Sequence, residues 1–204
     1  MTILLAGATG LVGSRVLALL PDAVPVGRRA TGRAGEVVAD FAALPLLPAV
    51  DVAICALGTT IRIAGSQAAF RAVDFDAVLA FARAAQAAGV THFMMVTAVG
   101  ADPKSTVFYS CVKGEIEQAV TALGFARLDI MQPGLILGPR ADRRPVEAFL
   151  QWIAPVLKSL LSGRLDKYGG ISGDAVAAAI VTLTGQSLPG CFVHQNRAMR
   201  ALAA

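Results

Sequence analysis

The stretch I-L-L-A-G-A-T-G-L-V-G (3–13) decides the fold of this 204-residue chain. Its first four residues are apolar, as in a buried strand, and a glycine-rich turn follows them directly and opens a helical pattern. Gly7 permits a tight turn, Gly10 lets the backbone approach a pyrophosphate, and Gly13 lets helix and strand pack closely. The position between a buried strand and an amphipathic helix favours a dinucleotide-binding turn. A glycine turn that binds no ligand is the alternative.

The rest of the chain continues this alternation of short apolar runs and helical stretches. Strands are expected at 24–26, 36–39, 52–56, 92–96 and 125–131, and helices at 11–20, 67–88 and 106–123. The pattern predicts a Rossmann-type α/β fold: a doubly wound, mostly parallel sheet with helices on both faces. After Pro133 the pattern weakens, with helices expected at 145–161 and 173–184, a last strand at 191–194 and a short terminal helix. We expect a single domain over residues 1–204, with a small C-terminal extension on the substrate side.

The composition is typical of a globular chain and does not indicate a nucleic-acid-binding protein. Hydrophobic residues make up 55% of the chain and charged residues 16%. The formal net charge is +4, but the basic residues are scattered apart from Arg28-Arg29 and Arg143-Arg144. Neither pair is long enough to form a nucleic-acid-binding stripe. An anionic small ligand would account for the excess of positive charge.

Three cysteines, Cys55, Cys111 and Cys191, are odd in number and lack CxxC spacing. We interpret them as reduced, buried thiols of a cytoplasmic protein, which predicts neither a disulfide framework nor a metal site. The apolar stretch at the N-terminus has no basic region before it and is too short for a signal peptide.

The most apolar stretch, residues 146–161, is interrupted by Glu147, Gln151, Pro155 and Lys158. No apolar run in the chain reaches the length that spans a bilayer, so we expect no transmembrane segment. A helix packed on the core is the favoured interpretation of 146–161. The alternative is an amphipathic surface that meets a protein partner, a second copy of the chain or a membrane face.

The residues after the second expected strand indicate which dinucleotide binds. An NAD-preferring fold usually has an acidic residue there, which binds the ribose 2′-hydroxyl. This chain has V-G-R-R (26–29) instead, and two guanidinium groups suit a 2′-phosphate. NADP(H) is therefore the expected cofactor, with a solvated arginine pair as the alternative. By position alone, Asp40 and Phe41 are expected to bound the adenine pocket, and A-L-G-T-T (56–60) to lie near the middle of the cofactor.

A tyrosine and a lysine four residues apart mark the candidate chemistry. Tyr109 and Lys113 share an apolar stripe of the expected helix 106–123, and Glu117 is expected on the opposite side. A buried ammonium needs partners, which a tyrosine hydroxyl and a cofactor ribose would supply. Lys113 would lower the pKa of Tyr109, which would give its proton to a carbonyl oxygen as hydride arrives. Thr97, at a strand end, is expected to hydrogen-bond the same oxygen. The alternative is an aromatic residue beside a lysine that extends to solvent.

These motifs resemble the atypical branch of the short-chain dehydrogenase/reductase superfamily, which has NmrA-like and epimerase-like relatives. The turn G-A-T-G-L-V-G (7–13) and Y-S-C-V-K (109–113) have its spacing. The segments 56–74, 92–117 and 127–140 are similar to the human Tat-interacting-protein oxidoreductase group and its bacterial relatives. The resemblance covers roughly residues 1–145, with a looser tail.

The resemblance implies an NADPH-binding Rossmann domain and assigns its site residues. Near the pyrophosphate it places Gly7, Thr9, Gly10, Leu11 and Val12, and near the 2′-phosphate Arg28 and Arg29. Near the ribose it places Gly58 and Thr59, with Ala56 and Leu57 beside them, and bordering the nicotinamide Pro133, Gly134 and Leu135. Tyr109 and Lys113 are implied to be the catalytic pair, with Thr97 in the role of the family's catalytic serine; all three would also contact the cofactor.

Two departures from the family pattern bear on function. Thr97 followed by Ala98 stands where the superfamily has its catalytic serine, and the chain lacks the large C-terminal substrate domain of the extended branch. The expected function is NADPH-dependent reduction of a small carbonyl compound. The alternative is an NADPH-binding sensor or scaffold that regulates a protein partner without turnover, because members of this group are often argued to act through protein contacts. Epimerase or dehydratase chemistry on a nucleotide sugar is a third option, for which a chain of this length leaves little room.

Overall fold

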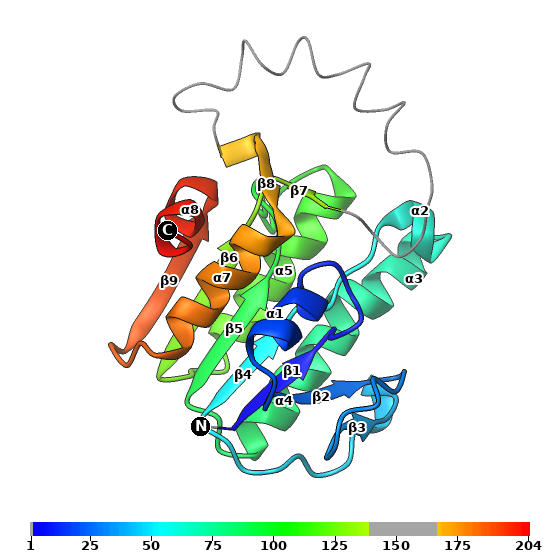
Figure 1. The fold of residues 1–204 in the computed structure, drawn as a ribbon. Helices are drawn as coiled ribbons and strands as arrows, with labels where there is room; N and C mark the ends of the chain where they lie inside the picture. The colour runs from blue at the N-terminus through cyan, green and yellow to red at the C-terminus, as the bar shows by residue number, and fades with distance from the viewer. Residues whose placement is uncertain (1, 139–166) are drawn as a thin grey trace.

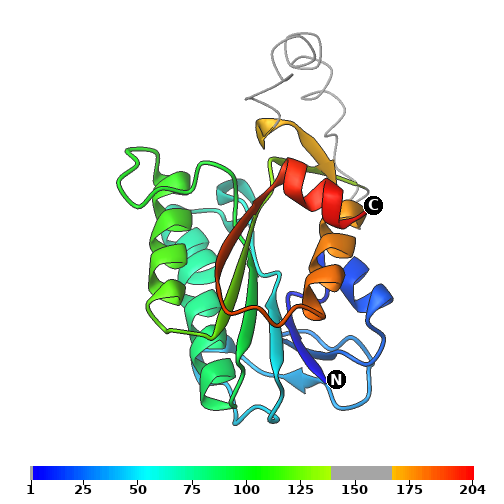
Figure 2. The same ribbon diagram turned by 90° about the vertical axis from the view of Figure 1, so that its left-hand side faces the viewer.

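The fold is a parallel sheet between two layers of helices, in a computed structural model that describes residues 2–138 and 167–204. Figure 2 views the sheet along its edge, with the helical layers on either side. The helix expected at 145–161 and the apolar stretch 146–161 lie outside the described residues.

The sheet has seven strands, all parallel to their neighbours. Their order is β3 (Val37–Val38), β2 (Val24–Gly27), β1 (Ile3–Ala6), β4 (Val52–Cys55), β5 (His92–Val96), β6 (Arg127–Gln132) and β9 (Gly190–Gln195). The predicted doubly wound Rossmann sheet is confirmed. Because the chain order reverses between β1 and β4, a crevice is expected at the carboxyl ends of these two strands, where ligands bind in such sheets.

Helices cover both faces of the sheet (Figures 1 and 2). One face carries α1 (Gly13–Leu19), α7 (Gly173–Thr184) and α8 (Asn196–Leu202). The other carries α3 (Gln67–Arg71), α4 (Val78–Ala87) and α5 (Phe108–Thr121), and the short α2 (Ile61–Ala64) precedes α3.

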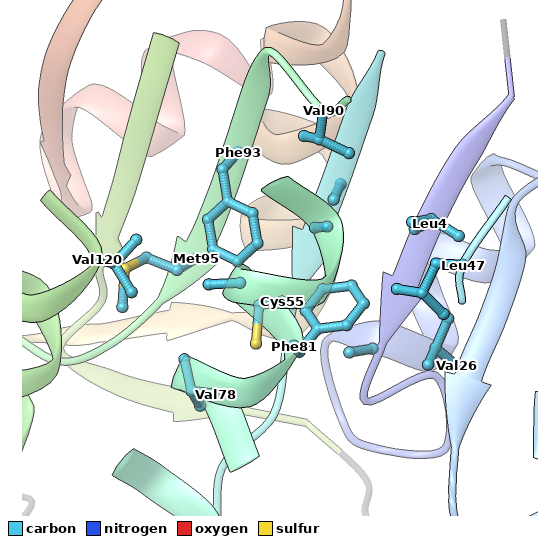
Figure 3. Close-up of a cluster of buried hydrophobic side chains, with 14 of the residues drawn as sticks. Leu4, Val26, Leu47, Cys55, Val78, Phe81, Val90, Phe93, Met95 and Val120 are labelled. Carbon is cyan, nitrogen blue, oxygen red and sulfur yellow. The ribbon is translucent and has the colours of Figure 1, made fainter. Parts of the chain in front are cut away.

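Each helical layer encloses its own hydrophobic core, because successive residues of a strand point to opposite faces. On β5, Phe93 and Met95 join the core under α4 and α5, where Phe81 also lies (Figure 3). Met94, between them in sequence, joins the core under α1 and α7.

The sequence pattern did not show two local features. The expected helix 67–88 is interrupted by a π-helical segment, Ala72–Ala77, between α3 and α4. One extra residue in a turn barely disturbs apolar spacing, so periodicity conceals it. A second, two-stranded parallel sheet, β7 (Leu135–Leu137) with β8 (Gly170–Ser172), lies beyond the carboxyl end of β6. The sequence pattern beyond Pro133 was too weak to indicate either strand.

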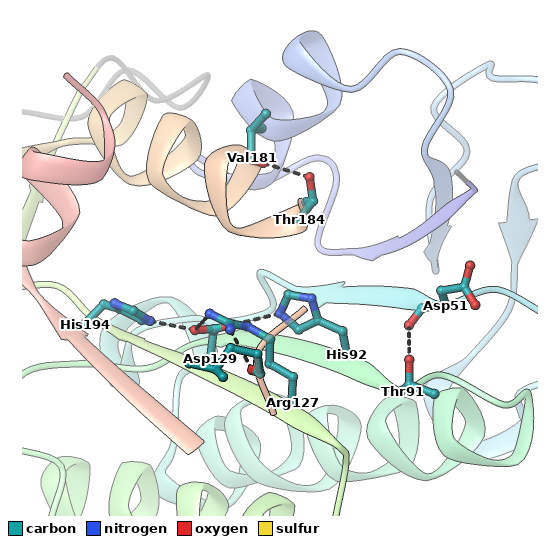
Figure 4. Close-up of polar contacts among 9 residues, drawn as sticks. Asp51, Thr91, His92, Arg127, Asp129, Val181, Thr184 and His194 are labelled. Carbon is teal, nitrogen blue, oxygen red and sulfur yellow. Dashed lines mark hydrogen bonds and ion pairs between the residues drawn. The ribbon is translucent and has the colours of Figure 1, made fainter. Parts of the chain in front are cut away.

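A buried carboxylate joins three strands beneath α7 (Figure 4). Asp129 on β6 is fully buried and accepts hydrogen bonds from His92 Nε2 on β5 and His194 Nε2 on β9, both at 2.7 Å. Arg127 Nε and Nη2 donate to the same carboxylate. A carboxylate only accepts, so both histidines must present Nε2–H to it. Burial raises the pKa of Asp129, but the hydrogen bonds from His194, His92 and Arg127 outweigh it and hold that pKa well below its usual range.

All three cysteines are free, but only Cys55 is buried; Cys111 is half-buried and Cys191 is exposed on the edge strand β9. The expectation of three buried thiols is therefore wrong for two of them. Within the described part of the chain, no helix combines the length and apolar character needed to cross a bilayer. Among residues 2–138 and 167–204, no three His, Cys, Asp or Glu side chains are grouped to hold a metal ion.

Candidate cofactor-binding and catalytic site

The glycine turn lies at the switch point between β1 and β4. Gly7 has a positive φ of 84°, and a Cβ there would lie 2.5 Å from the carbonyl carbon of Ala56. A Cβ at Gly13 would lie 2.1 Å from Gly7 O, so α1 can start this close to the strand only with glycine at that position. Thr9 and Gly10 are exposed, which leaves the outer backbone of the turn open to a ligand.

The loop after β4 lies directly beside this turn. Ala56 N–H donates to Ala6 O at 2.9 Å, which extends the pairing of β4 with β1 by one residue. Gly58 is exposed, and Thr59 N–H donates to Asp74 Oδ2 at 2.8 Å. The structure therefore brings the turn 7–13 and the loop 56–60 together, as the sequence predicted. Of the turn's apolar residues, Leu11 is half-buried and Val12 is buried.

Arg28 and Arg29 follow the end of β2 and are exposed. Within the described residues neither guanidinium has a hydrogen bond or ion pair, so both are available to an anion. Asp40 Oδ1 accepts from Ala42 N–H and caps a 3₁₀ turn. Phe41 begins that turn and packs in the core edge-on against Phe81. An adenine pocket in this region would therefore be bounded by the exposed Asp40 and by the backbone of the turn. The buried ring of Phe41 would pack behind that backbone.

Tyr109 and Lys113 occupy one face of α5, as expected. Lys113 is only 4% exposed, and its Nζ lies 2.7 Å from Oδ1 of the fully buried Asp74. Tyr109 is half-buried, with its ring centroid 5.5 Å from that of Phe70. The lysine therefore has a charged partner within the protein, and it does not extend to solvent.

Burial raises the pKa of Tyr109, Lys113 lowers it, and Asp74 raises it. The balance lies above the usual tyrosine value. The sequence predicted the contribution of Lys113 correctly but missed the larger effect of burial and the opposing carboxylate. In the structure as it stands, Tyr109 is a neutral phenol at physiological pH.

The hydroxyl of Thr97 faces α5. Its Oγ1 donates to Glu117 Oε1 and lies 3.3 Å from Met131 O, and Gln132 Nε2 donates to both oxygens of Glu117 at 3.0 Å. The expectation that Glu117 lies on the side of the helix opposite Tyr109 and Lys113 is wrong, and burial raises its pKa. Glu117 is eight residues beyond Tyr109, about 12 Å along the helix axis at 1.5 Å per residue. In the described structure, Thr97 therefore contacts α5 farther along the helix than Tyr109.

Pro133, Gly134 and Leu135 lie where β6 passes into β7. Val99 N–H donates to Pro133 O at 2.9 Å, and Gly134 N–H donates to Asn196 Oδ1 at 3.0 Å. A Cβ at Gly134 would lie 2.3 Å from Gly169 O, so only glycine fits there. These residues lie beside the loop between β5 and α5, at the carboxyl edge of the sheet.

Sequence reasoning missed Asp74 and Glu117. A pattern for Asp74 was present: it follows Phe70 by four residues and so falls on the apolar stripe of its helix. A carboxylate on one apolar stripe and a lysine on another predict a buried ion pair once the two helices are known to be neighbours. A comparable pattern was present for Glu117, which follows Lys113 by four residues and so lies beside it on the surface of the helix.

Whole-sequence comparisons identify relatives of the chain. No protein-family model matches it. The protein fmp52, mitochondrial, of Aspergillus fumigatus is 33% identical over 210 residues, which cover 91% of this chain and 90% of that protein. Protein HTATIP2 of Rattus norvegicus is 36% identical over 170 residues, which cover 75% of this chain and 68% of that protein. Protein fmp52, mitochondrial, of Emericella nidulans is 40% identical over 145 residues, although the chain spans only 62% of its length.

Solved structures share the fold. MoeE5 in complex with UDP-glucose and NAD has a TM-score of 0.72 at 20% identity, over 95% of this chain and 75% of that one. The human epimerase family protein SDR39U1 with NADPH has a TM-score of 0.69 at 18% identity, over 96% of this chain and 74% of that one. At such identities the likeness concerns the fold alone.

The doubly wound sheet and the glycine turn at its switch point define a Rossmann-type protein. The chain belongs to the group of proteins that includes fmp52 and HTATIP2.

The expectation of a cytoplasmic protein is wrong. Fmp52 relatives from four fungi are named as mitochondrial, which points away from the cytoplasm. The expectation rested on unpaired cysteines, and reduced thiols indicate a reducing environment without distinguishing one such compartment from another.

Proposed function

We propose that this protein is an NADP(H)-dependent oxidoreductase that reduces a small carbonyl compound, with Tyr109 as the proton donor and Lys113 as its charged neighbour. The observation that carries the proposal is the placement of Lys113. Its ammonium is buried near the loop 56–60, held by Asp74, one helical turn from Tyr109. A buried ion pair is costly to form, and its position at the ligand-binding edge supports a functional reason for it.

The residues at the switch point fit a dinucleotide. Gly7 and Gly13 leave no room for side chains, and the exposed Thr9 and Gly10 offer a bare backbone to a pyrophosphate. Gly58 is exposed next to the Asp74–Lys113 pair, on the side where a ribose would lie. When bound, NADPH supplies the hydride for the carbonyl carbon. Arg28 and Arg29 support a preference for the 2′-phosphate, since both guanidinium groups are exposed and have no partner within the described residues.

The protein's own part of the reaction is proton transfer. Tyr109 keeps its proton at physiological pH, because burial raises its pKa, and it can give that proton to a carbonyl oxygen as negative charge develops there. Lys113, whose Nζ lies 2.7 Å from Asp74 Oδ1, would be the cationic neighbour of the resulting phenolate. Thr97 is proposed as the hydroxyl that steadies the substrate oxygen, which requires it to release its hydrogen bond to Glu117.

Turnover by a Tyr109→Phe variant tests the proposal. Purified protein is incubated with NADPH and a fractionated metabolite extract, and loss of reduced nicotinamide is followed by absorbance. We expect wild type to consume NADPH in particular fractions and Tyr109→Phe to be slower by about 10²-fold or more, with cofactor affinity retained. The matched control is Tyr168→Phe, which makes the same chemical change at the other tyrosine and should keep wild-type turnover. Equal rates in wild type and Tyr109→Phe would exclude a catalytic tyrosine.

A second function, an NADPH-binding sensor that regulates a protein partner without turnover, draws support from Thr97. Its hydroxyl proton is engaged by Glu117, so the substrate-binding hydroxyl is not free in this conformation. This alternative predicts that NADPH changes the affinity for a captured partner and that Tyr109→Phe has no effect on it. An affinity that is the same with and without NADPH would rule the sensor out.

A further inference from the structure

Two side chains one helical turn apart on the 67–77 segment meet two side chains one turn apart on α5. The ring of Phe70 packs on the ring of Tyr109 at 5.5 Å, and Asp74 Oδ1 lies 2.7 Å from Lys113 Nζ. Phe70 and Asp74 are both fully buried. The π-helical turn carries Asp74, so the local change of helical pitch helps set which α5 residue its carboxylate meets.

The carboxylate of Asp74 is divided between two tasks. Oδ2 accepts the Thr59 N–H at 2.8 Å and so fixes the loop after β4. Oδ1 has no hydrogen bond of acceptable geometry within the described residues, and its one close polar neighbour among them is the ammonium of Lys113. Since a buried carboxylate and a buried ammonium each need a partner, neither charge would persist here without the other.

Other charged groups around Tyr109 are few in the described part of the chain. Glu117 lies one turn beyond Lys113 on α5, where burial raises its pKa. Cys55 on β4 is a buried thiol whose pKa is raised to about 12 by burial, so it stays neutral. Arg71 and Glu115 form a partly exposed ion pair between the same two helices. The Asp74–Lys113 pair is therefore the main pair of opposed charges close to the tyrosine, and opposite charges this close largely cancel at a distance.

We propose that Asp74 is a positioning residue that sets the protonation state of the Tyr109–Lys113 pair, by holding Lys113 as the ammonium and cancelling most of its charge as felt by Tyr109. Tyr109 then rests as a proton donor in the cofactor-free protein. The inference deepens the proposed function and rests on it for its consequence in turnover, but the ion pair can be tested without any turnover.

The first test is an NMR titration of Asp74→Asn, following the tyrosine ¹³Cζ and lysine side-chain signals in a Tyr168→Phe background that leaves one tyrosine. Asparagine keeps an oxygen for Thr59 N–H but removes the charge. We expect either Lys113 or Tyr109 to lose its proton at least about one pH unit lower than in wild type, a tenfold shift in the equilibrium. Unchanged titration of both groups would overturn the proposal.

A second pair of variants tests whether Asp74 cancels the charge of Lys113 as felt by Tyr109. Neither variant leaves Lys113 without its carboxylate partner. Lys113→Met leaves the carboxylate unopposed and is expected to raise the pKa of Tyr109 by about one unit or more. Asp74→Asn/Lys113→Met removes both charges together, which buried pairs often tolerate, and is expected to return Tyr109 to within about half a unit of wild type. If the pKa of Tyr109 in the double variant differed from wild type as much as it does in Lys113→Met, the idea that the two charges cancel would be overturned.

Glu115→Gln is the matched control, because it breaks the neighbouring ion pair between the same helices. It should leave the titration of Tyr109 and Lys113 unchanged, and a shift as large as that of Asp74→Asn would assign the effect to helix docking instead. If the protein turns over, the alkaline limb of the kcat profile should follow whichever group shifts in Asp74→Asn. A wild type that never turns over would overturn the proposed function, while the titrations would still decide the role of Asp74.

Discussion

At the residue scale, the adjacent guanidinium groups at the end of β2 carry the proposed preference for NADP(H). Arg28 and Arg29 follow Gly27, the last residue of β2, and are exposed. A guanidinium forms planar, charge-assisted hydrogen bonds to phosphate, whereas a ribose hydroxyl calls for a carboxylate at this place. The proposed discrimination would therefore depend on two exposed side chains outside the core.

Neutralising either arginine should weaken NADPH binding selectively. Arg28→Gln or Arg29→Gln is expected to raise the Kd for NADPH by about 10-fold or more, since a hydrogen bond to a charged group contributes about 1.5–3 kcal/mol. The Kd for NADH should change little. Fluorescence titration measures both constants, and Arg83→Gln, an exposed arginine on α4, controls for net charge. Equal losses for NADPH and NADH would contradict a 2′-phosphate site.

At the scale of secondary-structure elements, one buried carboxylate adds side-chain contacts to the backbone pairing of β9 with β6. Asp129 on β6 receives hydrogen bonds from β5 and β9, and Arg127 Nη1 also donates to Leu188 O ahead of β9. Arg127 further lies over the ring of Phe192, 4.5 Å from its centroid. An edge strand that buries little apolar surface is thus fixed by buried polar contacts (Figure 4).

Replacing this carboxylate should destabilise the fold in a pH-dependent way. Asp129→Asn is expected to lower the free energy of unfolding at pH 7 by about 3–5 kcal/mol, because it leaves buried donors without their charged acceptor. The pKa of Asp129 is depressed in the fold, so its contribution is present above the unfolded pKa of about 3.9 and is lost as pH falls toward the folded value.

The stability difference between wild type and Asp129→Asn should therefore hold near neutrality and shrink below about pH 4. Urea unfolding at several pH values measures it, with the exposed Asp51→Asn as control. A difference that widens in acid would contradict the depressed pKa.

At the scale of the whole molecule, the carboxyl edge of the sheet near its switch point gathers segments from several parts of the chain. The turn 7–13, the loop 56–60, α5 and the β6–β7 connection all meet at the carboxyl edge of the sheet. A ligand that contacts them all binds the folded state and has no comparable site in the unfolded chain. Binding of the proposed cofactor would therefore be linked to global stability.

NADPH should raise the melting temperature of the wild-type protein. At a free concentration of 100 times Kd the expected stabilisation is about 2.7 kcal/mol, or roughly 5–10 °C for a chain of this size. Differential scanning fluorimetry measures the shift, and NADH at the same concentration should give a smaller one. An unchanged melting temperature at millimolar NADPH would argue against a dinucleotide site.

The sequence by itself determined the Rossmann architecture, because the glycine turn and the alternation of buried strands with helices are local patterns. Neighbouring backbone approaches Gly7 and Gly13 so closely that only glycine fits there. The glycine spacing of the turn 7–13 already indicated this close approach. The shared face of Tyr109 and Lys113 also follows from helical spacing alone.

Only the tertiary structure decided how the charges of the site are arranged. The partner of Lys113 is 39 residues away in sequence, and a π-helical turn that leaves no mark on the apolar pattern carries it. The same holds for Thr97, whose hydroxyl bonds Glu117, and for Asp129, whose donors come from three strands. Local spacing fixes which face a residue occupies, but an ion pair or hydrogen bond depends on which elements become neighbours, and packing of the whole chain sets that.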